Sequence, residues 1–352
     1  MPPSGRAASP WVSSSRKSVG DAPRIRLVPG RAGRYSAPSA ETVRLLAVAQ
    51  SPESMAVIAA ALEPLGESLR RLLATSSVPG GTLERSYVDF TLKADWAVRP
   101  LSEAYSLAGM NLGHTADHLM GAAACIRAGA ISYSVVTLVR AGLESAAQTF
   151  YLMAGEIGTR ERVRRWANLL LQSDMESLRL LQGLAHPEPA AETELHERMD
   201  RIVKSARQHA FQVTDLRDSP KMRERLRPPH LDHSLPSTMS MINDLLSTPG
   251  RATGSKSGET TYRALSAVAH SQMHGLRQFW MRDTAAAAKD PGMMTLSYGV
   301  TGPQLVFWLT PLVLAAVSVG QLRSTALGQP AHEWPASTAP ILLQWQNWMN
   351  AR

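Results

Sequence analysis

The sequence predicts an all-α protein, a multi-helix bundle with long connections and a disordered N-terminal arm. Three observations lead to this fold class: apolar residues recur with the period of a helix, strands of alternating polarity separated by hairpin turns are lacking, and no repeat of fixed period indicates a solenoid. The 352 residues suffice for one large domain or two small ones. We expect a single helical domain over 41–352.

Residues 1–40 differ from the rest of the chain in composition. They contain seven basic residues and one acidic residue, together with much Ser, Pro, Gly and Ala. Such a segment cannot bury enough apolar surface to offset its chain entropy, so we expect a disordered basic arm. The arm carries most of the net charge of +8, and the rest of the chain carries only +2. The net charge therefore does not indicate a basic groove on the folded domain.

Capping residues and breaks delimit the expected helices. Ser51 is a good N-cap for the first helix, Gly129 a C-cap for the second, Thr159 an N-cap for the fourth, and Ser237 or Thr238 opens a short one. Segments that contain Pro or Gly form connections at 76–100 and 250–258, and the polar, Pro-rich segment 213–236 is expected to be a loop around a short helix. The expected helices are 52–75, 101–128, 132–154, 160–184, 190–212, 237–246, 259–281, 304–327 and 338–350.

The most apolar stretch of the chain is 305–320, inside a segment, 291–322, that has no charged side chain. A membrane-spanning helix needs about 20 apolar residues. Pro311 and the flanking glutamines interrupt the run, so we expect a buried core helix and no membrane span. The only cysteine is Cys125, which excludes a disulfide framework and favours a cytoplasmic location.

The expected helix 132–154 is apolar nearly all round, and its only charged residues are Arg140 and Glu144. A helix of this kind is buried, and each buried charge then needs a partner. The pair is either a structural ion pair that fixes the helix register or part of a polar pocket inside the bundle.

Two histidines, His114 and His118, lie one turn apart on the expected helix 101–128. Histidines four residues apart can bind one metal ion from a helix. The same spacing is common in surface or core histidines that bind no metal. We assign both residues to the polar pocket and expect no metal or other cofactor, with a metal-binding bundle as an alternative that also uses Glu144, His270 or His274.

A row of polar residues follows one face of the expected helix 259–281. Its members are Arg263, Ser266, His270, His274 and Arg277. Arginine can hold a phosphate, and histidine can transfer a proton near neutral pH. The row is either a solvated face or a chemical site, with Arg263, Ser266 and His270 as candidate catalytic residues and His274 in the polar pocket.

The start of the expected helix 160–184 is unusually basic, with Arg160, Arg164 and Arg165 close together. Positive side chains at a helix N-terminus oppose the helix dipole. These arginines form either a solvated helix start or a rim that binds an anion.

Arg263 and His270, with six residues between them, resemble the Arg-x(4–6)-His motif of HEPN domains. These are helical bundles, and many are metal-independent ribonucleases that act as homodimers. The resemblance implies that Arg263 stabilises a phosphate and that His270 acts as a general acid or base. Active members usually have a polar residue after the Arg, whereas this chain has Ala264. A toxin or defence role would follow from the ribonuclease activity.

A broader resemblance covers about residues 110–280. The segments around Arg140 and Glu144, around Arg160 to Arg165, and from Tyr262 to His270 are similar to an uncharacterised family of helical proteins from high-GC bacteria. The resemblance implies no activity. It does imply that Arg140, Glu144, Arg263, Ser266 and His270 meet in one place.

Three functions follow from these patterns. The first is a HEPN-like, non-catalytic module that binds RNA or a protein partner. The second is a HEPN-type ribonuclease that uses Arg263 and His270. The third is the metal-binding bundle. If these polar residues lie together in the structure, they form one composite site. If they lie apart, they belong to separate polar faces.

Overall fold

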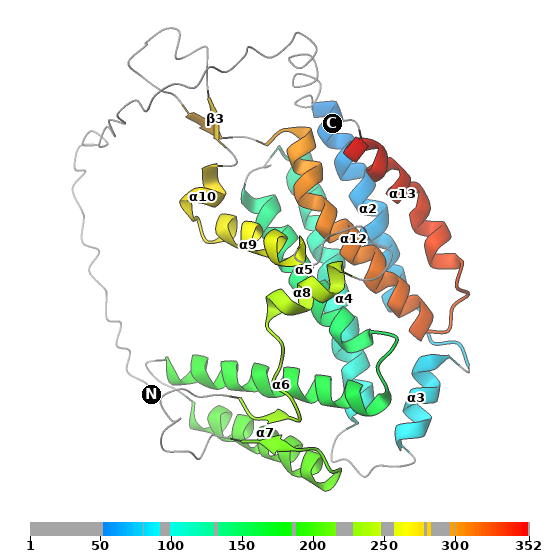
Figure 1. The fold of residues 1–352 in the computed structure, drawn as a ribbon, viewed down its shortest axis with the longest axis vertical. Coiled ribbons are helices and arrows are strands. Elements are labelled where there is room, and N and C mark those ends of the chain that lie inside the picture. Colours follow the sequence, from blue (N-terminus) through cyan, green and yellow to red (C-terminus); the bar gives the residue numbers. More distant parts are fainter. Residues whose placement is uncertain are drawn as a thin grey trace, which may run out of the picture. The chain divides into compact units, whose positions relative to one another are not determined.

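The computed structural model confirms the all-α fold class (Figure 1). The structure describes residues 52–79, 81–91, 99–129, 133–184, 188–215, 228–247, 257–277, 280–282, 296–298 and 300–350. All of them belong to one unit that spans Arg44–Arg352. The arm predicted at 1–40 lies outside the described residues.

Helices account for most of the described chain. They are α2 (Pro52–Ala74), α3 (Thr82–Thr91), α4 (Pro100–Arg127), α5 (Tyr133–Met153), α6 (Thr159–Gln182), α7 (Pro189–Gln208), α8 (Thr238–Leu246), α9 (Ser257–Ala269), α10 (Met273–Leu276), α12 (Gly302–Ala326) and α13 (Glu333–Asn350). Two small antiparallel pairs accompany them: β1 (Val213–Thr214) with β2 (His230–Leu231), and β3 (Trp280–Arg282) with β4 (Leu296–Tyr298).

The core is built around α4 and α5, which pack against each other, with α2 against α4 and α12 against α5 (Figure 1). Alanines on the inner face of α4, such as Ala108 and Ala116, are fully buried and allow its neighbours to approach closely. α5 contributes Val139 and Leu143, also fully buried. Burial of these side chains is the main force that assembles the bundle.

The apolar segment near the C-terminus forms α12, as predicted. Thr301 caps it: its hydroxyl accepts from the backbone of Gln304, whose side chain in turn accepts from the backbone of Thr301. In the described part of the chain, α12 is long and apolar enough to span a membrane, but 56% of its apolar window is buried inside the protein. It packs against α5, α2 and α13, which agrees with the predicted core helix.

Several predicted boundaries agree with the structure, and one predicted cap does not. Gly129 adopts a positive φ of 70° one residue after Ala128, the C-cap of α4, and Ser237 caps α8 by accepting from the backbone of Ser240. Thr159, predicted to cap α6, is instead its first residue, and Gly158 occupies the cap without a side-chain bond. Ser51 lies outside the described residues.

Two predicted segments differ more. The connection predicted at 76–100 contains helix α3. The helix predicted over 259–281 ends at Ala269, because the chain reverses at Ser271, where φ is 53°. After the reversal, Gly275 of α10 packs on the backbone of α9, and a Cβ there would lie 2.6 Å from the carbonyl carbon of Ala267.

Candidate functional site

Arg140 and Glu144 face α9 from the middle of α5, in the part of α5 that packs against α8 and α9. Arg140 Nε donates to Glu144 Oε1 over 2.9 Å. The two side chains are 21% and 31% exposed, so the pair lies at the edge of the core, where water still reaches one side. Arg140 thus has a partner on its own helix.

Residues from α9 and from the turn after it complete the cluster. Arg140 Nη1 lies 3.1 Å from His270 Nε2, and Arg140 Nη2 donates to the Tyr262 hydroxyl over 3.3 Å. The Tyr262 hydroxyl donates to Glu144 Oε1 over 3.0 Å. We call Arg140, Glu144, Tyr262 and His270 the α5–α9 cluster. The predicted convergence of Arg140, Glu144 and His270 is therefore present.

Arg140 retains hydrogen-bonding capacity in this arrangement. A guanidinium has five N–H donors, and contacts to Glu144, His270 and Tyr262 use three of them. Burial lowers the pKa of Arg140, but the hydrogen bond to Tyr262 and the charge of Glu144 together outweigh it and hold that pKa above its usual range. Arg140 therefore stays a cation with two N–H groups that no described residue accepts from.

His118 lies beside the cluster on α4, whereas His114 points outward. A Cβ on Gly142 would lie 3.0 Å from His118 Cβ, so His118 packs against α5. The pKa of His118 is lowered, chiefly by burial and then by His114, with Asp117 and Glu144 acting in the opposite direction. His118 thus senses the charge of Glu144, while His114 is exposed.

The predicted polar row on α9 is not a single site. Arg263 is 69% exposed and pairs with Glu259 on its own helix over 2.6 Å. Ser266 lies one turn from both Tyr262 and His270, and its hydroxyl is buried with no partner among the described residues. His274 is exposed on α10, beyond the chain reversal, so it does not continue the row. Arg263 and His274 are therefore not seen in the α5–α9 cluster.

His270 owes its position to the end of α9. Ser271 donates its backbone N–H to Val268 O, and Gln272 donates its own to Ala267 O, the pattern of a Schellman motif. His270 is then the C-cap residue, directly after α9, and its ring reaches Arg140. The positive φ of Ser271 is what turns the chain away after His270.

The structure offers little to a metal ion. Among the described residues, no three His, Cys, Asp or Glu side chains gather into a group that could hold a metal. The candidate ligands of the metal-binding bundle among these residues, His114, His118, Glu144, His270 and His274, form no such group.

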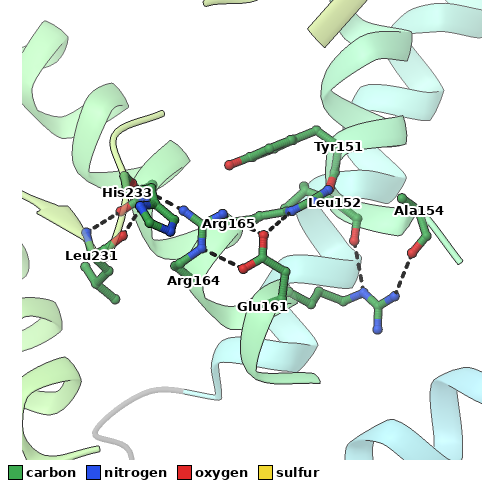
Figure 2. A network of polar contacts seen from close by, with 10 residues as sticks. Tyr151, Leu152, Ala154, Glu161, Arg164, Arg165, Leu231 and His233 are labelled. Carbon is green, nitrogen blue, oxygen red and sulfur yellow. Dashed lines mark hydrogen bonds and ion pairs between the residues drawn. The ribbon is translucent and has the colours of Figure 1, made fainter. Parts of the chain in front are cut away.

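The arginines at the start of α6 bind groups of the protein itself. Arg164 and Arg165 both donate to Glu161, and they also donate to the carbonyl oxygens of His233 and Tyr151 (Figure 2). Arg160 donates to the carbonyls of His209 and Ala210.

These contacts join the start of α6 to the end of α5, the end of α7 and the segment after β2. Glu161, held by Arg164 and Arg165, has its pKa lowered to about 2. The guanidiniums predicted to bind an external anion thus have structural partners, and the α6 arginines do not form an open rim.

Sequence reasoning missed Tyr262 as a member of the site. Tyr262 and Ser266 are four residues apart, and His270 follows after another four, which is the spacing of one helix face. The prediction placed Arg263 on that face instead. The arginine that contacts His270 is Arg140, from a helix 130 positions earlier.

Comparison of the chain with protein families, with curated proteins and with solved structures finds no match.

Proposed function

We propose that this protein is a non-catalytic, HEPN-like module that binds RNA through the α5–α9 cluster. The main support for the proposal is the hydrogen bonding of Arg140. This cation donates to Glu144 and Tyr262 and keeps two N–H donors that no described residue accepts from. A planar guanidinium with open donors suits bidentate contact with a phosphate. His270 stands beside the same donors and can add a second contact.

Glu144 and Tyr262 act as positioning residues in this proposal. Their contacts fix the plane of the Arg140 guanidinium, so less side-chain freedom is lost when a phosphate binds. The basic segment 1–40 adds attraction that does not depend on sequence and weakens with salt. The α5–α9 cluster would contact one phosphate of the RNA, and the arm would attract the RNA backbone in general.

The test is RNA binding by the full chain, followed by fluorescence anisotropy of a labelled single-stranded RNA. Arg140→Lys keeps the charge but removes the planar fork, and we expect it to weaken binding about tenfold. Arg201→Ala is the matched control, since Arg201 is an exposed arginine on α7 with a 3.8 Å contact to Glu197. It should change affinity by less than about twofold. Equal binding by wild type and Arg140→Lys contradicts the proposal.

A second candidate is a metal-independent ribonuclease, and the contact between Arg140 and His270 favours it. In this reaction the ribose 2′-oxygen attacks the phosphorus, the bond to the 5′-oxygen breaks, and a histidine moves a proton to or from one of these oxygens. Arg140 would stabilise the negative charge that develops on the phosphate. The resemblance to HEPN domains assigns that role to Arg263 and places the site in a homodimer.

RNA cleavage in EDTA separates the two candidates. Cleavage that is lost in His270→Ala supports the ribonuclease. A larger loss in Arg140→Lys than in Arg263→Ala places the phosphate at the α5–α9 cluster, and the reverse order favours the HEPN motif itself. Binding without cleavage, with His270→Ala folded as wild type by circular dichroism, supports the non-catalytic module.

A further inference from the structure

The Glu144 carboxylate has one oxygen that the α5–α9 cluster does not use. Arg140 Nε and the Tyr262 hydroxyl both donate to Oε1, over 2.9 and 3.0 Å. No described residue donates a hydrogen bond to Oε2. A carboxylate can accept about four hydrogen bonds through its two oxygens, so Glu144 keeps acceptor capacity for a further donor.

Solvent reaches the unused oxygen. The Glu144 side chain is 31% exposed, and Oε2 is not one of the buried polar atoms that lack a partner in the described chain. Since no described residue donates to Oε2, its absence from that set means that the oxygen is accessible. A ligand that approaches from solvent can therefore reach Oε2.

The open acceptor of Glu144 lies beside the open donors of Arg140. The bond from Arg140 Nε to Glu144 Oε1 joins the two side chains, and Arg140 retains two N–H groups that no described residue accepts from. A phosphate can accept from Arg140, but it has no proton to give to a carboxylate and is repelled by the carboxylate charge. The position at Oε2 therefore suits a neutral donor that is attached next to a phosphate.

We infer that Glu144 Oε2 accepts a hydrogen bond from the ribose 2′-hydroxyl beside the phosphate that Arg140 holds, so that Glu144 makes the cluster selective for RNA over DNA. The inference rests on the proposed function and goes beyond it, since there Glu144 only positions Arg140. The 2′-hydroxyl is a donor that RNA has and DNA lacks. The positive charge of Arg140 partly offsets that of Glu144, which reduces the repulsion of the phosphate.

The half-exposed position of Glu144 limits this selectivity. A buried site that binds a hydroxyl strongly rejects the analogue without it, because its polar groups are left unpaired. At Oε2, water can take the place of the missing hydroxyl when DNA binds. We therefore expect the wild type to bind single-stranded RNA about tenfold more tightly than DNA of the same sequence.

Fluorescence anisotropy of labelled RNA and DNA with the full chain tests the inference. Both strands contain only adenine and cytosine, so that they differ only at the 2′ position. Glu144→Gln keeps an acceptor for Arg140 and Tyr262 but places an amide donor at the position of Oε2. We expect this variant to bind the two strands within about twofold of each other. Its DNA affinity should equal or exceed that of the wild type, because a negative charge is removed.

Glu259→Gln is the matched control. Glu259 is 33% exposed and pairs with Arg263, four residues later on α9, over 2.6 Å. The control removes the same charge from a similar ion pair, so it should change the RNA and DNA affinities by the same factor. Equal ratios of RNA to DNA affinity in wild type and Glu144→Gln overturn the inference. A loss of both affinities in Glu144→Gln at an unchanged ratio also overturns it, because Glu144 then only positions Arg140.

A third strand tests the hydroxyl without any change to the protein. RNA with fluorine in place of each 2′-hydroxyl has no donor there but keeps the sugar pucker of RNA. We expect the wild type to bind this strand about as weakly as DNA. Binding as tight as that of RNA would overturn the inference, because the protein would then recognise the shape of the strand.

Failure of the inference can be told apart from failure of the proposed function. Equal RNA binding by wild type and Arg140→Lys contradicts the proposed function, and the inference with it. Weaker RNA binding by Arg140→Lys, together with an unchanged ratio of RNA to DNA affinity in Glu144→Gln, contradicts the inference alone.

Discussion

Arg140 Nη1 lies 3.1 Å from His270 Nε2, although the two residues are 130 positions apart in the chain. Arginine can only donate, so His270 Nε2 accepts this bond and its ring proton resides on Nδ1. The contact is available to the neutral ring alone, because a charged ring would place two donors face to face. An anion bound between the two side chains would replace this contact and accept a hydrogen bond from Arg140.

Glu144→Ala tests how far the α5–α9 cluster stabilises the fold. The substitution removes the carboxylate that accepts from both Arg140 and Tyr262. Because both charged side chains still reach water, we expect a loss of about 1–2 kcal/mol in the free energy of unfolding, measured by urea denaturation.

Glu67→Ala serves as the control, since Glu67 pairs with Arg70 on an exposed helix face at 3.6 Å. We expect it to change stability by less than about 0.5 kcal/mol. Equal effects of the two substitutions would mean that the cluster contributes nothing beyond a surface ion pair.

The Glu161 network should make stability depend on acid pH. The pKa of Glu161 is about 2 in the fold, held there mainly by Arg164, against 4.5 for the free side chain. A depressed pKa contributes stability that is fully present above about pH 5 and is lost as the pH falls toward 2. Since Glu161 is about a third exposed, solvent screening limits this contribution to about 1–2 kcal/mol.

Comparison of wild type with Glu161→Gln measures that contribution. Their difference in the free energy of unfolding should be largest near pH 6 and should shrink steadily below about pH 4.5. A difference that stays constant down to pH 2 would show that the charge of the Glu161 carboxylate does not stabilise the fold through Arg164 and Arg165.

Local patterns account for the parts of the fold that could be predicted from the sequence. Helical periodicity and caps located α4, α5 and α12 to within a few residues, because these helices are set by their own apolar faces. The end of α9 was missed because Ser271, a residue without special preference for positive φ, turns the chain there. Its conformation depends on the packing of Gly275 on α9, which the sequence does not reveal.

The site was predictable only in part for a similar reason. Arg140 and Glu144 stood out as the only charges on an apolar helix, and that signal was correct about their need for partners. Which α9 residue meets them depends on the rotation of α9 against α5. Rotation by about one residue exchanges Arg263 for Tyr262, and an amphipathic pattern is too broad to fix it.

Two glycines should respond in opposite ways to alanine. Gly258 lies where α9 crosses α8, and a Cβ there would stand 2.5 Å from Asn243 Cα, so the helices must separate. We expect Gly258→Ala to lower the free energy of unfolding by about 2–3 kcal/mol. Gly109 of α4 has only Leu73 Cδ2 nearby at 3.9 Å, so Gly109→Ala should raise stability by about 0.5–1 kcal/mol through helix propensity.

Thermal and urea unfolding of both variants checks this pair of predictions. If Gly258→Ala is tolerated without loss, the close crossing of α8 and α9 does not exist in solution. If Gly109→Ala destabilises, the space beside Gly109 is filled by something other than the described residues.

Ser271 links the stability of the α9 end to the candidate site. Its φ of 53° costs a non-glycine residue about 1–2 kcal/mol, and more for a β-branched side chain. Ser271→Gly removes that strain but adds freedom to the unfolded chain, so we expect stability within about 1 kcal/mol of wild type. Ser271→Val should lower the free energy of unfolding by about 1–2 kcal/mol.

Because His270 directly precedes Ser271, the valine variant should also weaken RNA binding, whereas the glycine variant should bind RNA like wild type. Anisotropy titrations with RNA and urea unfolding of both variants test this. If Ser271→Val is folded and binds RNA as tightly as Ser271→Gly, the turn does not position His270 for its ligand.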